Sequence, residues 1–191
     1  MGISKAYVAK QLFNAALVGA VAFVLSGGYN DWADRQARQV VIETNPALQL
    51  ESENARLTDR DWKQIDCLAR NMYFEARNQD DDGMAAVSDV VFNRIEDPKY
   101  PGSACEVITQ PGQFSWLWDG KRHVMEDKFE TARAYKIALD VWQSRAVHYK
   151  PDHKDETGGA TRYHADYVKP RWKGWSQTVQ IGAHKFFKTG N

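Results

Sequence analysis

The chain has 191 residues, which is enough for one compact domain and a short additional segment. Its 25 basic and 25 acidic residues cancel to a formal net charge of zero, and this balance argues against nucleic-acid binding, which usually requires a basic surplus. Aromatic residues make up 12% of the chain, which suits either a groove that stacks on sugar rings or a core that uses Trp for bulk.

The N-terminal segment predicts export. Residues 11–30 contain no charged residue, and lysines precede them while aspartates follow. About 20 apolar residues span a bilayer, and this charge asymmetry places the following residues outside. Residues 1–30 therefore fit a cleaved signal peptide, a permanent signal anchor or a releasable one, with a buried core helix as the remaining alternative. We expect contact with the inner membrane through residues 11–30, and a remainder that is exported, tethered to that membrane or periplasmic.

The two cysteines of the chain are Cys67 and Cys105. In an oxidising compartment, a disulfide between them is reasonable. Two separate buried thiols are the alternative, because nothing in the sequence fixes the distance between the two residues.

The region after the N-terminal segment divides into a polar linker at 31–57 and a domain at 58–191. Thr58 and Asp61 form a capping-box pattern at the start of this domain. Apolar residues then recur every three or four positions, which predicts a helix that ends where Asp80, Asp81, Asp82 and Gly83 break it. Further helices are expected over 84–95 and over 126–145, where Phe129 is one of the apolar members, with a Pro- and Gly-containing loop over 97–103.

The C-terminal third changes character. Its β-branched and aromatic residues predict two β segments that form a hairpin, joined by a Trp-bearing loop. Helices followed by strands indicate an α+β domain.

Glu75, in the stretch "NMYFEARNQ", is the first candidate catalytic residue. Leu68, Met72 and Glu75 share one side of the first helix, so Glu75 lies at the edge of the apolar stripe. Apolar surroundings raise the pKa of a carboxyl group, as a general acid near neutral pH requires. A boundary glutamate paired with Arg77 or Arg94 is the alternative.

The segment "GQFSWLWDG", residues 112–120, sets polar groups among aromatic rings, as sugar binding requires. Tyr163 and His164 on the first predicted strand can also form hydrogen bonds with a sugar. The alternative is that they are a half-buried pair of strand residues without a binding role. The candidate substrate-binding residues of these two segments are Gln113, Phe114, Ser115, Trp116, Tyr163 and His164. Asp119 is the candidate second catalytic carboxyl, and a turn aspartate before Gly120 is the alternative.

Five blocks stand in the order and spacing of a known family: "CLARNMYFEAR", "MAAVSDVVFNRI", "PGQFSWLWDGK", "ATRYHADYVKPRW" and "IGAHKFF". Over about residues 62–188 the chain resembles the cell-wall hydrolases typified by spore cortex-lytic enzymes, whose relatives occur in Gram-negative bacteria and their phages. The resemblance implies a helix-rich, lysozyme-like or transglycosylase-like domain. It also implies cleavage of peptidoglycan between N-acetylmuramic acid and N-acetylglucosamine, with Glu75 as the catalytic acid. Asn78 departs from the family, whose members usually have glycine there.

Two chemical routes stay open. Hydrolysis usually needs two carboxyl groups, about 5–5.5 Å apart for retention or about 6.5–9.5 Å for inversion. Without a second carboxyl, Glu75 would serve as acid and then as base, while the muramic acid 6-hydroxyl closes a 1,6-anhydro ring. We expect no metal and no cofactor, because the histidines show no His-Glu-x-x-His spacing.

The expected biological setting is a phage endolysin that lyses the host, acting as a monomer on peptidoglycan. A bacterial enzyme that remodels the envelope is the first alternative. A non-catalytic, membrane-tethered module that binds peptidoglycan is the second.

Overall fold

The structure, a computed structural model, describes residues 28–45, 49, 56–146 and 153–189. Most of the predicted membrane segment at 11–30 lies outside these ranges. Within them, no helix combines the length and the apolar composition that crossing a bilayer would require.

The chain divides into two units, with the boundary between Val40 and Val41. Helix α2, Gly28–Thr44, runs through this boundary and occupies part of the predicted linker. All other described elements belong to the second unit, and they contain the fold that positions the site.

Helix α4, Asp59–Ala76, begins at the predicted capping box. The Thr58 hydroxyl accepts a hydrogen bond from the Asp61 amide at 3.2 Å, and the Asp61 carboxylate accepts one from the Thr58 amide at 2.8 Å. Each side chain therefore satisfies a backbone donor that the first turn leaves unpaired. Ile65, Leu68 and Met72 are fully buried, so the predicted apolar face is confirmed.

Helix α5, Asp81–Glu96, begins three residues earlier than predicted. The Asp80 carboxylate accepts a hydrogen bond from the Gly83 amide at 2.9 Å and caps this helix. Asp81 and Asp82 lie in the first turn, where the positive end of the helix dipole favours carboxylates. The acidic run therefore separates two helices and also starts the second, which corrects its interpretation as a simple break.

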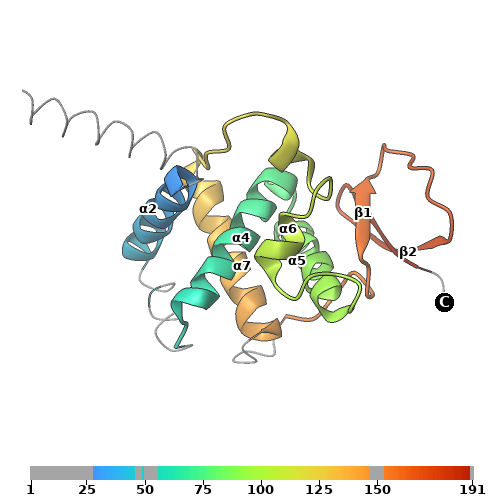
Figure 1. Ribbon diagram of the computed structural model, residues 1–191, viewed down its shortest axis with the longest axis horizontal. Coiled ribbons are helices and arrows are strands. Elements are labelled where there is room, and N and C mark those ends of the chain that lie inside the picture. Colours follow the sequence, from blue (N-terminus) through green and yellow to red (C-terminus); the bar gives the residue numbers. More distant parts are fainter. Residues whose placement is uncertain (1–27, 46–48, 50–55, 147–152, 190–191) are drawn as a thin grey trace, which may run out of the picture. The chain divides into compact units, whose positions relative to one another are not determined.

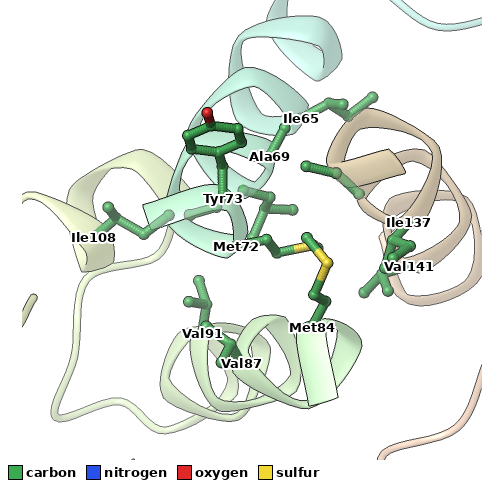
Figure 2. Packing of buried hydrophobic residues seen from close by; sticks show 14 of the residues in the cluster. Ile65, Ala69, Met72, Tyr73, Met84, Val87, Val91, Ile108, Ile137 and Val141 are labelled. Atoms are coloured by element: carbon green, nitrogen blue, oxygen red, sulfur yellow. The ribbon is translucent and has the colours of Figure 1, made fainter. Parts of the chain in front are cut away.

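The remaining helical elements are α6, Ala104–Ile108, the 3₁₀ helix η1, Ser115–Trp118, and α7, Lys128–Arg145. Figure 2 shows the core where side chains of α4, α5, α6 and α7 meet, with Met72 of α4 beside Met84 of α5. Phe129 does not join this core: it is 74% exposed, because the apolar positions that α7 buries begin one turn later.

A three-stranded antiparallel sheet follows the helices and lies to one side of them (Figure 1). Its strands are β1, Arg162–Ala165, β2, Trp175–Ile181, and β3, His184–Thr189, in the order β1-β3-β2. The prediction of two β segments was incomplete, because the second segment turns back on itself at Gly182, where φ is +53°. The α+β class is confirmed.

The sheet packs against α5 through one face. Phe186 of β3 is fully buried with Ala86 and Val90 of α5, and Tyr163 of β1 packs against the same cluster. Because side chains alternate along a strand, the neighbours of Tyr163 and Phe186 point to the opposite face.

A disulfide joins Cys67 of α4 to Cys105 of α6, with 5.3 Å between their Cα atoms. The bond closes a loop with a sequence separation of 38 residues and ties α6 to the middle of α4. Cys105 precedes the aromatic segment at 112–120 in the sequence.

Candidate functional site

A cavity of about 540 Å³ opens where the end of α4 meets β1 and the segment before η1. Five of the sequence-predicted residues line it: Glu75, Gln113, Ser115, Tyr163 and His164. These come from three segments far apart in the sequence, and the packing of the sheet on α5 brings them together.

Glu75 lies at the C-terminal end of α4 and is partly buried. Burial raises the pKa of its carboxyl group, and a hydrogen bond from Tyr163 works in the opposite direction without cancelling this effect. The Tyr163 hydroxyl donates to Glu75 Oε2 at 3.1 Å. The negative end of the helix dipole also disfavours the carboxylate there. A carboxyl group with a raised pKa, with one oxygen held by a donor, has the properties of a general acid.

The two arginines considered as ion-pair partners of Glu75 form hydrogen bonds with other residues. Arg77 donates to the Tyr73 hydroxyl at 3.2 Å, and Arg94 donates through Nε to the Thr161 carbonyl at 2.8 Å. Tyr163, which the sequence suggested only as a substrate-binding residue, holds the carboxyl instead.

Asp119 is not brought to the cavity. Its carboxylate accepts hydrogen bonds from the Lys121 amide at 2.9 Å and from His123 at 2.8 Å, which makes it a turn residue. The backbone bond from Lys121 and the bond from His123 lower the pKa of Asp119. Among the described residues that line the cavity, Glu75 is the only one with a carboxyl group.

Phe114 and Trp116 are core residues rather than cavity residues, with exposures of 1% and 7%. Trp116 donates through Nε1 to Asn71 at 3.1 Å and stacks on Phe74 at 4.8 Å between ring centroids. The predicted sugar-binding segment is therefore divided: Gln113 and Ser115 line the cavity, whereas the rings of Phe114 and Trp116 lie in the core. Gln113 and Ser115, which alternate with the two buried rings along the chain, are exposed and line the cavity.

Two buried residues of the cavity wall were not among the predicted site residues. Arg94 is 4% exposed, and its Nη1 atom has no hydrogen-bond partner among the described residues. His184 packs edge-on against Tyr163 at 5.1 Å, and burial lowers the pKa of its imidazole. A buried side chain gives little signal in a single sequence: Arg94 was considered only as a possible ion-pair partner of Glu75, and His184 stands in the block "IGAHKFF" without an assigned role.

The outer wall of the cavity comes from β1 and the loop after it. Besides the predicted Tyr163 and His164, it contains five residues that were not predicted: Arg162, Ala165, Tyr167, Val168 and Trp172. Within the part of the chain that the structure describes, no group of His, Cys, Asp or Glu is placed to hold a metal ion.

Gln79 fixes the sheet against the end of α4. Its side-chain oxygen accepts a hydrogen bond from the Ala183 amide at 2.8 Å, in the turn between β2 and β3. Its backbone carbonyl accepts one from Arg133 of α7 at 2.7 Å. This residue therefore connects the helical core to the sheet four positions after Glu75.

Comparison with known proteins places the chain among cell-wall enzymes. The family model described as Cell Wall Hydrolase matches residues 78–187. Spore cortex-lytic enzymes are similar in sequence: that of Halalkalibacterium halodurans is 34% identical over 125 residues, covering 64% of this chain and 34% of the relative. That of Bacillus subtilis is 33% identical over 92 residues, covering 46% of this chain and 30% of the relative.

Two solved structures share the fold. The catalytic domain of the germination-specific lytic transglycosylase SleB from Bacillus anthracis has a TM-score of 0.52 at 27% identity, covering 69% of this chain and 97% of that one. The catalytic domain of SleB from Bacillus cereus has a TM-score of 0.51 at 29% identity, covering 65% and 89%.

The alignments span about a third of the length of the first curated relatives, whereas they cover nearly all of the solved catalytic domains. The family model covers the second predicted helix, the aromatic segment and the sheet, and begins three residues after Glu75. The resemblance seen in the sequence blocks is thereby confirmed, and the chain belongs to the cell wall hydrolase family.

Proposed function

We propose that this chain cleaves the glycan strand of peptidoglycan between N-acetylmuramic acid and N-acetylglucosamine. The observation that carries the proposal is the partly buried Glu75 carboxyl group, which accepts a hydrogen bond from Tyr163 in a cavity large enough for a sugar. Membership of the cell wall hydrolase family and similarity to a domain described as a lytic transglycosylase support the same reaction.

The route is that of a lytic transglycosylase. Glu75 gives its proton to the glycosidic oxygen, and the bond from that oxygen to C1 of muramic acid breaks. The Glu75 carboxylate then takes the proton of the muramic acid 6-hydroxyl, whose oxygen bonds to C1 and closes a 1,6-anhydro ring. The acid is regenerated, and no water is consumed.

Support for this route over hydrolysis comes from the carboxyl groups around the cavity. Hydrolysis by two carboxyls needs a partner within about 5–9.5 Å. Among the described residues that line the cavity, only Glu75 has a carboxyl group. The Asp119 carboxylate lies elsewhere and forms hydrogen bonds with Lys121 and His123.

The test is product analysis with Glu75→Gln, which keeps the size of the side chain and removes its acidity. Purified cell walls are digested, and the fragments are analysed by mass spectrometry in ¹⁸O-labelled water. We expect anhydro ends without ¹⁸O from the parent, and a loss of at least about a hundredfold in rate for the variant. Glu126→Gln, an exposed glutamate beyond the cavity, is the matched control.

Two results would contradict the proposal in different ways. Reducing ends that carry ¹⁸O would identify a hydrolase and refute the transglycosylase route. Full activity of Glu75→Gln would refute the role of Glu75 itself.

We further propose a division into a signal or anchor segment at 1–30, a linker at 31–57 and a catalytic domain at 58–191. In this proposal the domain acts outside the inner membrane as a monomeric phage endolysin. The disulfide supports export, because such bonds persist in oxidising compartments. A reporter fused to residues 1–35 distinguishes the options: a signal peptide is cut, an anchor stays in the membrane, and a releasable anchor appears intact in the periplasm.

Bacterial envelope remodelling is the alternative setting, and a non-catalytic binding module is the alternative function. Expression of the parent in a host with intact walls tests the first, because an endolysin should lyse the culture. Release of soluble fragments from purified walls tests the second, because a binding module releases none.

A further inference from the structure

A second hollow, of about 240 Å³, lies on the outer face of the sheet and continues the cavity around Glu75. His164, Val168 and Trp172 line both spaces. A chain-like ligand bound beside Glu75 can therefore extend along the sheet without leaving the protein surface.

Strand register places the walls of this second hollow on one face. His164 of β1 pairs with Lys185 of β3, and Phe187 of β3 pairs with Gln177 of β2. These side chains alternate with Tyr163 and Phe186, which pack against α5, so they point away from the helical core.

Aromatic rings are concentrated on this outer face. Trp172 lies 6.1 Å from Trp175 and 5.6 Å from Phe187 between ring centroids, and His164 stacks on Phe187 at 4.9 Å. All of these rings are only partly buried, and the guanidinium of Arg162 lies 4.3 Å from the Trp175 ring. Half-exposed rings on a rigid strand scaffold are suited to contact the apolar face of a sugar.

Basic residues surround the rings. Lys169 and Lys185 line the hollow, and Arg171 and Lys173 belong to the same loop between β1 and β2. The lining that the structure describes contains no acidic residue. This face is therefore complementary to a ligand that combines sugar rings with carboxylate groups.

We propose that the outer face of the sheet binds the peptidoglycan strand beyond the bond that is cut. In this arrangement one sugar stacks on the rings around Trp175, and Lys169 and Lys185 contact carboxylates of the attached peptide. The inference rests on the proposed function, because it extends the same substrate past Glu75. It assigns to the sheet a role in selecting long, peptide-bearing strands over short fragments.

The test measures binding to soluble peptidoglycan fragments of increasing length in a Glu75→Gln background, which prevents turnover. Affinity of the background protein should rise as fragments grow from two sugars to six or more. Trp175→Ala should remove this gain and weaken binding of the long fragments by about tenfold, with little effect on the shortest. Phe129→Ala, which removes a more exposed ring from α7, is the control and should leave the length dependence intact.

A second measurement isolates the basic residues. Lys169→Ala with Lys185→Ala should weaken binding of peptide-bearing strands by about tenfold and leave strands stripped of peptide unchanged. Lys128→Ala, an exposed lysine of α7 that lines neither hollow, is the control.

Unchanged length dependence in a folded Trp175→Ala protein overturns the inference. So does a Trp175→Ala protein that loses binding only to anionic phospholipid vesicles, which would make this face a membrane surface. Because binding is measured without turnover, these outcomes are separate from the tests of the proposed reaction, which measure the cleavage of cell walls by the parent and by Glu75→Gln.

Discussion

Removal of the disulfide between Cys67 and Cys105 should destabilise the domain strongly. The perturbation is the double variant Cys67→Ser with Cys105→Ser, which leaves no unpaired thiol. The bond acts mainly by limiting the conformations of the unfolded chain, so the cost follows from the length of the loop that it closes. For a sequence separation of 38 residues, loop closure amounts to about 13 cal/mol/K, or about 4 kcal/mol near room temperature.

Thermal unfolding followed by circular dichroism measures this effect. For a chain of this size, about 4 kcal/mol corresponds to a decrease in Tm of about 8–16 °C. A reductant should lower the Tm of the parent toward that of the double variant and leave the variant unchanged. Neither cysteine lines the cavity, so activity below the transition should be retained.

A double variant that unfolds within about 3 °C of the parent would refute this reasoning. It would show that the unfolded chain is already restricted between α4 and α6, so that the bond removes little further freedom. A parent that does not respond to reductant while the variant is destabilised would instead attribute the loss to the new hydroxyl groups.

Three further predictions concern the site and its supports. Tyr163→Phe removes the hydrogen-bond donor that favours the ionised form of Glu75, so the pKa of Glu75 rises further. The alkaline limb of the pH–activity profile should therefore move to higher pH, and the rate should fall about tenfold. The hydrogen bond to Asp89 raises the pKa of His153 in the folded protein. The contribution of His153 to the free energy of unfolding is therefore complete below about pH 6.5 and is lost as the pH rises through the pKa of the folded state. In urea unfolding, the stabilities of the parent and of His153→Gln should differ at about pH 6 and converge at alkaline pH. Gly182→Ala should cost about 1–3 kcal/mol in urea unfolding, because φ is +53° there.

Each of these predictions has a control or a refuting outcome. For Tyr163, an alkaline limb that stays in place would show that the hydroxyl does not act on Glu75. For His153, an equal difference from the parent at acidic and alkaline pH would indicate lost packing rather than lost charge. Gly102→Ala is the control for Gly182, since a Cβ at Gly102 meets nothing within 4 Å, whereas one at Gly182 would lie 2.5 Å from the Gln79 side chain.

The helical half of the domain could be predicted because its signals are local. The capping box at Thr58 and the spacing of Leu68 and Met72 depend only on nearby residues, and the structure reproduces both. The start of α5 was misplaced because acidic residues interrupt one helix and stabilise the first turn of the next, and the pattern does not separate these effects.

The sequence predicted only those features of the site that depend on neighbouring residues. The position of Glu75 on α4 followed from helical periodicity, but its contact with Tyr163 depends on how a distant sheet docks. Gln113 and Phe114 were given the same predicted role, and the path of an irregular segment decides that Phe114 is buried while Gln113 lines the cavity. A pattern of residue types does not specify that path.

The hydrogen bond between Glu75 and Tyr163 sets the stage of synthesis at which the candidate site can form. The two residues are 88 positions apart, and the acid is synthesised long before its donor. A ribosome that has completed α4 to α7 has made a helical core without the wall that β1 supplies. The pair of Glu75 and Tyr163 can therefore assemble only after the strands have been made and have docked on α5.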